Sequence, residues 1–234
     1  FHITKQGFEF YEAFFNTPYP FGNKYDQVFA PEFNEGAMEN VALVTFTEHY
    51  LFKTTPTRAQ KANYFDTVLH ELAHVWFGNL VTPQWWDGLW LNESFATYTA
   101  ALCLAEATEY GNISWQNFNS SIKAWAYQED QLKTTHPIQG IVKDTDTCLL
   151  NFDGITYGKG SSLLKQLVYV IGMDGFKAGM QYYFNQYSWK NTTINDFLGA
   201  LEIGSQHVGG NFKASIWCQQ HLNTAGLNNF IPHI

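Results

Sequence analysis

The sequence has few cysteines, no long apolar run and little positive charge, and each absence excludes a class of protein. The three cysteines, Cys103, Cys148 and Cys218, are widely spaced and odd in number, so they predict neither a disulfide framework nor a paired zinc–thiolate site. No apolar run approaches the roughly 20 residues that a membrane-spanning helix needs. Lysine and arginine total 13 against 21 for aspartate and glutamate, giving a formal net charge of −8. Without a basic cluster we expect no nucleic-acid partner.

The start of the chain and its cysteines set expectations about the whole protein. Because the chain begins at Phe1 rather than at a methionine, we expect a segment of a longer protein. We expect no signal peptide, and together with the unpaired cysteines this favours a cytoplasmic location. An extracellular or membrane-anchored ectodomain stays open if the parent protein carries an anchor.

The composition is that of a folded domain with a sizeable core. Hydrophobic residues make up 45% of the 234 residues and aromatic residues 18%, and no repeat or flexible linker interrupts them. The first part has a mixed pattern, with a short helix predicted at 8–15 and strands at 25–29 and 42–46. From residue 57 the pattern becomes helical, which predicts an α+β fold with a small α/β lobe, about 1–80, and a larger helical lobe, about 81–234.

Apolar residues at three-to-four spacing place the first long helix. Ala62, Phe65, Leu69, Leu72 and Trp76 share one face, and Gly78 is a plausible C-cap. Similar patterns predict further helices at 92–109, 115–132, 161–171, 175–187, 194–201 and 212–225.

A metal-binding motif lies on the first long helix. His70 and His74 are four residues apart, so both imidazoles project from one face and can reach one zinc ion at roughly 2.0–2.1 Å. Glu71, next to the first histidine, can take a proton from a zinc-bound water. A chance match on an amphipathic helix, with two satisfied core histidines, is the alternative to this five-residue pattern.

A third ligand strengthens the zinc hypothesis. Glu93 follows His74 after eighteen intervening residues and lies on the next predicted helix. Two histidines and one carboxylate leave the fourth zinc position open for water, as in catalytic rather than structural sites. Asn92 is a candidate to orient a histidine through its free ring nitrogen, although capping the helix is an equally plausible and compatible role.

These motifs resemble those of the zinc aminopeptidases of the aminopeptidase N family. The resemblance rests on His70-Glu71-x-x-His74 with Glu93, and on Gly36-Ala37-Met38-Glu39-Asn40 before them. It continues through Trp85-Trp86-Asp87, Trp90-Leu91-Asn92-Glu93, Phe152–Gly160 and Leu222–Leu227, and so covers nearly the whole chain in order.

The resemblance implies a thermolysin-like fold with one zinc ion in the cleft between the lobes. Gly36 and Ala37 would form an edge for the substrate backbone, Met38 would pack against its first side chain, and Glu39 would hold its free α-amine. Asn40 completes this substrate-binding segment. Judged alone, Glu39 would be read as a solvated loop acid.

The resemblance also implies that Tyr157 donates a hydrogen bond to the tetrahedral oxyanion. Among 13 tyrosines, only its Tyr-x-Lys-Gly context separates it from a packing residue.

The sequence departs from the family in two respects. A carboxylate that relatives often carry four or seven positions after the glutamate ligand is replaced by Thr97 and Ala100. Either another acid supports the histidine, with Asp87 and Glu106 as candidates, or zinc is held somewhat less tightly. Relatives also have an N-terminal β-rich domain and a C-terminal helical domain that this chain does not contain.

The sequence therefore predicts a zinc-dependent aminopeptidase that acts on peptides with a free N-terminus. An endopeptidase on the same scaffold is the alternative among enzymes. A zinc-containing binding or structural module with little turnover is the alternative of another class.

Overall fold

The structure is a computed structural model, and it describes residues 1–228. The last six residues of the predicted helical lobe, 229–234, lie outside the described residues.

Five strands are present among the described residues, β1 Asp26–Ala30, β2 Ala37–Met38, β3 Leu43–Thr47, β4 Val81–Pro83 and β5 Lys190–Thr192. The α-helices are α1 His2–Phe15, α2 Arg58–Ala73, α3 Leu89–Ala107, α4 Gly111–Asn117, α5 Ala124–Glu129, α6 Thr145–Leu149, α7 Gly160–Ile171, α8 Met173–Tyr187, α9 Ile194–His207 and α10 Ala214–His221. Two 3-10 turns, η1 Glu48–Tyr50 and η2 Trp86–Gly88, and two π-helical segments, η3 Phe118–Lys123 and η4 Ile155–Lys159, complete the order.

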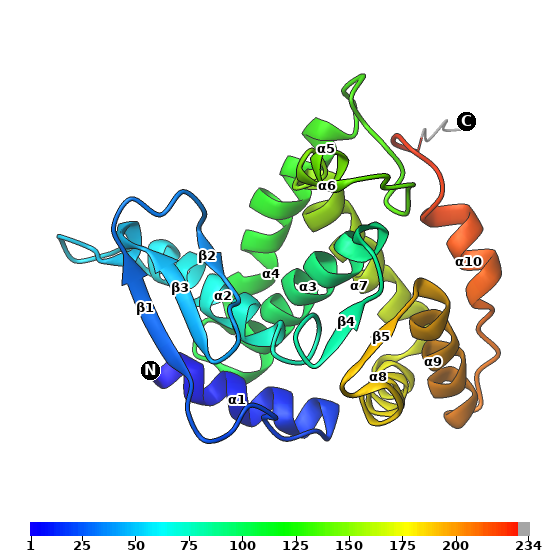
Figure 1. The fold of residues 1–234 in the computed structure, drawn as a ribbon, viewed down its shortest axis with the longest axis horizontal. Coiled ribbons are helices and arrows are strands. Elements are labelled where there is room, and N and C mark those ends of the chain that lie inside the picture. The colour runs from blue at the N-terminus through cyan, green and yellow to red at the C-terminus, as the bar shows by residue number, and fades with distance from the viewer. Residues whose placement is uncertain (229–234) are drawn as a thin grey trace.

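The first sheet has three strands and lies beside α2 (Figure 1). β3 is central, with β1 parallel on one side and β2 antiparallel on the other, where Ala37 is paired with Phe46. β2 is therefore an edge strand, and it carries Ala37 and Met38 of the predicted substrate-binding segment. The backbone of Thr47 also donates to the carbonyl of Gly36, which fixes the entry to this edge.

α2 begins at a capping box and ends earlier than the sequence predicts. Thr57 Oγ1 accepts from Gln60 N, and the Gln60 side chain accepts from Thr57 N, so two unpaired helix-end donors are satisfied. The helix ends at Ala73 rather than continuing to Gly78. Gly78 instead has φ +122° in the turn toward β4, a conformation that favours glycine. The prediction of one helix closed by a Gly78 cap is thus wrong in its last turn.

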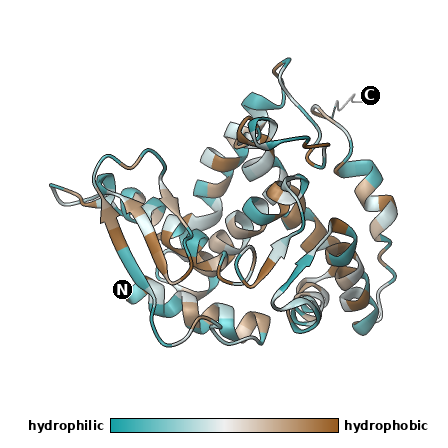
Figure 2. Ribbon diagram, viewed as in Figure 1, coloured by the Kyte–Doolittle hydropathy of each residue, from teal (hydrophilic) through white to brown (hydrophobic). Residues whose placement is uncertain are grey.

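α3 is the central helix of the core (Figure 1). Every residue from Glu93 to Leu104 is buried, because α2, α4, α7 and η4 pack around it. Aromatic rings fill the space beside it, and Phe77 stacks on Phe95 with ring centroids 4.1 Å apart. Figure 2 shows hydrophilic and hydrophobic segments mixed along α3. The helix that carries Glu93 is therefore fixed from all sides.

Other differences from the sequence prediction follow from tertiary packing. α1 begins at His2 rather than at residue 8, because Gly7 lets it approach α2 closely; a Cβ there would lie 2.6 Å from Leu69 Cδ2. The predicted helix at 115–132 is interrupted by η3, and the pair β4–β5 was not predicted. The mixed helix-and-sheet class is confirmed. Among the described residues, no helix is both long and apolar enough to cross a membrane.

Candidate metal centre

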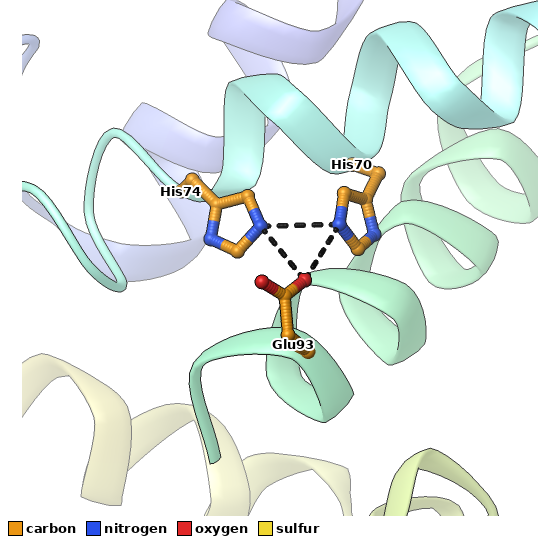
Figure 3. A group of neighbouring side chains, drawn as sticks. All are labelled: His70, His74 and Glu93. Atoms are coloured by element: carbon orange, nitrogen blue, oxygen red, sulfur yellow. Dashed lines mark hydrogen bonds and ion pairs between the residues drawn. The ribbon is translucent and has the colours of Figure 1, made fainter. Parts of the chain in front are cut away.

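His70, His74 and Glu93 converge on one point (Figure 3). The histidines project from α2 and the turn that follows it, and the glutamate from α3. His70 Nε2 lies 3.2 Å from Glu93 Oε2, His74 Nε2 lies 3.4 Å from the same oxygen, and the two Nε2 atoms lie 3.1 Å apart. All three side chains are buried or half-buried.

These spacings fit three ligands of one zinc ion. Ligand bonds of about 2.0–2.1 Å at tetrahedral angles place ligand atoms roughly 3.3–3.4 Å apart. The three observed distances of 3.1, 3.4 and 3.2 Å are close to that value. The donor set of two imidazoles and one carboxylate also suits zinc and leaves a fourth position open.

The Nδ1 atom of His74 is held by two neutral oxygens. Asn92 Oδ1 lies 3.0 Å and the carbonyl oxygen of Phe77 3.1 Å from it. Both oxygens are acceptors, so Nδ1 carries a proton, and Nε2 is the ring nitrogen that would bind a metal ion once its own proton is displaced. The turn after α2 is tight here, since a Cβ on Gly78 would lie 2.4 Å from Asn92 Oδ1.

The hydroxyl of Thr97 takes the corresponding place beside His70. Thr97 Oγ1 lies 3.3 Å from His70 Nδ1, and Thr97 is one helical turn after Glu93 on α3. Neither Asp87 nor Glu106 makes a hydrogen bond or ion pair with a histidine in the described part of the chain, and Glu106 is exposed far along α3. The expectation that one of these two acids supports a histidine is therefore wrong.

Two further carboxylates flank the metal position. Ligand atoms of Glu39, Glu71 and His74 all lie within 4.8 Å of one another. Burial raises the pKa of Glu71 to about 7, although the two histidines oppose the shift. Glu39 Oε1 lies 4.0 Å from His74 Nδ1, and Asn79 Nδ2 donates to the Glu39 backbone carbonyl at 3.0 Å. Asn79 thereby ties the edge segment to the turn after α2.

The charges of the centre raise the pKa of His74 and lower the pKa of Glu93. Burial alone would lower the pKa of His74, but Glu93 and Glu39 outweigh it and raise the pKa to about 10. Burial would raise the pKa of Glu93, whereas the charge of His74 and hydrogen bonds from both histidines hold it well below its usual range. Glu93 is therefore ionised at neutral pH, as a carboxylate ligand of a metal ion would have to be.

Tyr157 lies against the imidazole of His70. Its ring stacks on the His70 ring with centroids 6.0 Å apart and an interplanar angle of 19°. Burial, and then the negative charge of Glu93, raise the pKa of the phenol well above its ordinary value. The hydroxyl therefore stays protonated and able to donate.

An ion pair that the sequence did not indicate holds the start of η4, which carries Tyr157. His136 Nε2 lies 2.7 Å from Asp153 Oδ2, and His136 Nδ1 lies 2.8 Å from the carbonyl oxygen of Pro137. Asp153 Oδ1 in turn accepts from the backbone of Ile155 and Thr156. No spacing rule joins two residues in different loops, so only the tertiary structure reveals this pair.

Comparison with known proteins gives a consistent picture. The profile of the "Peptidase family M1 domain" matches residues 1–217. Over its full length the chain is 49% identical to "Aminopeptidase N" of Streptomyces lividans, of which it covers 27%. It is 40% identical to "Probable aminopeptidase 2" of Sulfurisphaera tokodaii, with 87% of this chain and 26% of that protein aligned. It is 38% identical to "Leucyl aminopeptidase" of Saccharolobus solfataricus, with 85% of this chain and 25% of that protein aligned. The chain thus spans about a quarter of the length of these relatives.

Proposed function

Because the chain belongs to peptidase family M1, we propose that the protein containing it is a zinc-dependent aminopeptidase. It would remove single residues from the N-termini of peptides. The observation that supports the proposal is the set of three candidate ligand atoms 3.1–3.4 Å apart, with the carboxylates of Glu71 and Glu39 beside them.

His70, His74 and Glu93 would hold one zinc ion. When bound, zinc supplies Lewis acidity that activates water and the peptide carbonyl. Asn92 and the Phe77 carbonyl orient His74, and Thr97 orients His70, so that both Nε2 atoms would be available to the ion.

Glu71 is the proposed general base. Its carboxylate would take the proton of the attacking water and later deliver a proton to the leaving amine. Tyr157 would donate its phenolic hydrogen to the oxyanion that forms at the carbonyl, which is the point where negative charge develops.

Glu39 and the edge strand are the proposed substrate site. The ammonium group of the substrate would bind the Glu39 carboxylate through charge-assisted hydrogen bonds. The substrate backbone would lie along Gly36 and Ala37 at the free edge of β2, as in β-strand addition. Met38, which is 38% exposed, would contact the first side chain, and Asn40 Nδ2 donates to Thr45 Oγ1 and so fixes the end of the segment.

The domain organisation belongs to the proposal. Residues 1–80 would form an α/β lobe and 81–234 a helical lobe, with zinc in the cleft between them. In support, the two histidines come from α2 and its end, whereas Glu93 and Tyr157 come from α3 and η4. Because the relatives are about four times longer, further domains of the whole protein would contribute to the substrate site.

A pair of peptides tests the proposal. A peptide with a free N-terminus should be cleaved, whereas its N-acetylated twin should not, because acetylation removes the charge that Glu39 binds. Glu39→Ala should depress cleavage of the free peptide strongly with zinc content unchanged, and Glu35→Ala, an exposed acid in the preceding loop, is the matched control. Efficient internal cleavage of the acetylated peptide would instead indicate an endopeptidase. Stoichiometric zinc without turnover of either peptide would indicate a binding module.

A further inference from the structure

An ion pair lies where the run Phe152–Gly160, which contains Tyr157, meets the C-terminal run Leu222–Leu227. Lys159 Nζ lies 2.8 Å from Asp130 Oδ2, and only 1% of the Asp130 side chain is exposed. Asp130 follows α5, and Lys159 is the last residue of η4. None of the proposed catalytic steps uses either residue.

The backbone of Gly226 forms hydrogen bonds with both residues of this ion pair. Lys159 Nζ donates to the Gly226 carbonyl at 3.0 Å, and Gly226 N donates to Asp130 Oδ1 at 3.1 Å. Thr135 Oγ1 donates to the same carboxylate oxygen at 2.7 Å. Asp130 Oδ2, by contrast, has no hydrogen bond among the described residues, so the charge of Lys159 is what compensates it.

The segment that carries Tyr157 has little room to move elsewhere. A Cβ on Gly158 would lie 2.5 Å from the Ile122 carbonyl oxygen, and a Cβ on Gly160 would lie 2.0 Å from Ser94 Oγ. Ser94, which adjoins the ligand Glu93, also donates to the carbonyl of Thr156. The backbone of η4 is thus packed between α3 and η3; Asp153 and Ser94 hold its first half, and Lys159 is the side chain that holds its end.

We infer that Lys159 and Asp130 are positioning residues for Tyr157, acting as an ionic lock that the Gly226 peptide closes. The inference rests on the proposed function, because it gives the lock a task only if Tyr157 stabilises the oxyanion. Lys159 is two residues from Tyr157 on the same π-helical segment, so loss of its anchor shifts the phenol relative to His70. A displacement of about 1 Å at a catalytic group can lower the rate about 100-fold.

The lock is tested by removing both charges together. Lys159→Met alone leaves a buried carboxylate without compensation and can prevent folding. Asp130→Asn combined with Lys159→Met leaves no such charge and keeps the shape of both side chains. The amide that replaces the carboxylate can still accept from Gly226 N and from Thr135 Oγ1 through its oxygen. Lys123→Met is the matched control, because Lys123 lines the same cavity between η3, α7 and α10 but makes no hydrogen bond to Gly226 or ion pair with Asp130 among the described residues.

We call the whole protein with Asp130→Asn and Lys159→Met, which lacks both charges, the double-charge variant. Its kcat should be about 10- to 100-fold lower than that of the wild type, with KM and zinc content unchanged. Amide hydrogen exchange should become faster across residues 154–160 in this variant and not in Lys123→Met. In a Tyr157→Phe background the same two substitutions should change kcat by less than about twofold, because the group they position is gone.

Three outcomes separate the inference from the proposed function. If Tyr157→Phe lowers kcat but the double-charge variant retains wild-type kcat and exchange, the lock is refuted and the role of Tyr157 stands. If the double-charge variant lowers kcat equally with and without the Tyr157 hydroxyl, the pair acts on general stability, and the inference is likewise refuted. If Tyr157→Phe itself has wild-type kcat, the proposed role of Tyr157 fails, and the lock fails with it.

Discussion

Gly78→Ala is the sharpest test of how the chain orients the His74 imidazole. Gly78 has φ +122°, and a Cβ there would lie 2.4 Å from Asn92 Oδ1 and 3.4 Å from His74 Nδ1. Contacts below 3.0 Å force a shift, so the Asn92 side chain must move away from the position where it accepts from His74.

Gly78→Ala should lower stability in two separable ways, through backbone strain and through loss of the hydrogen bond between His74 and Asn92, and the second should also weaken metal binding. The backbone conformation costs an alanine about 1–3 kcal/mol in stability. Loss of the bond between His74 and Asn92 costs a further 0.5–1.5 kcal/mol or so. Losing an outer hydrogen bond to a metal-ligating histidine typically weakens metal affinity by about 10- to 100-fold, which corresponds to roughly 1.4–2.7 kcal/mol.

Gly22→Ala separates the two parts. Gly22 also has a positive φ, +89°, but nothing lies within 4 Å of its Cβ position, so it carries the backbone cost alone. Zinc dissociation constants from chelator competition, measured beside the free energy of unfolding, should show weaker zinc binding in Gly78→Ala only. Asn92→Ala should reproduce that loss. Equal zinc affinity in the two glycine variants would refute the role given to Asn92.

Three other predictions concern single roles. Glu71→Gln should keep near-normal zinc content while activity falls at least about 100-fold, whereas His74→Ala should lose metal; zinc loss in Glu71→Gln would make Glu71 a ligand rather than a base. Tyr157→Phe should lower kcat roughly 100- to 1000-fold with little change in KM, and wild-type turnover would make it a packing residue. The hydrogen bond to Asp153 raises the pKa of His136 above its unfolded value, so its contribution to stability is complete below the ordinary histidine pKa and is lost as pH rises through the raised one. Free energies of unfolding against pH should show this loss in the wild type and not in Asp153→Asn; parallel curves would contradict it.

The sequence predicted most reliably what depends on local geometry. Residues four apart lie on one face of a helix, so convergence of His70 and His74 needed only that α2 form and that its C-cap residue, His74, keep helical geometry. The long helices α3 and α8 were likewise expected within a few residues of their observed bounds, because their apolar spacing persists over several turns. To predict that Glu93 lies beside the two histidines also required that α3 pack against α2. The eighteen-residue spacing between His74 and Glu93 indicated this packing.

What the sequence did not predict depends on contacts between distant segments. β2, β4 and β5 are two or three residues long and give no alternation to recognise. α2 was predicted too long because Trp76 and Phe77 are buried by the core after the helix has ended. Thr97 was noted only as the absence of an acid, although its hydroxyl occupies the place beside His70.

Support of His70 by the neutral hydroxyl of Thr97 rather than by an acid affects the charge balance of the centre as well as its hydrogen bonds. Both histidines are supported by neutral oxygens, from Asn92 and Phe77 at His74 and from Thr97 at His70. A carboxylate in such a position increases the basicity of the imidazole and adds negative charge near the ion. With Glu93 as the one anionic ligand, a dication would keep a net positive charge and more of its power to polarise a carbonyl. Glu71 and Glu39 lie beside this position without being among the three proposed ligands, and under the proposed function their charges would serve to take up a proton and to bind a substrate ammonium group.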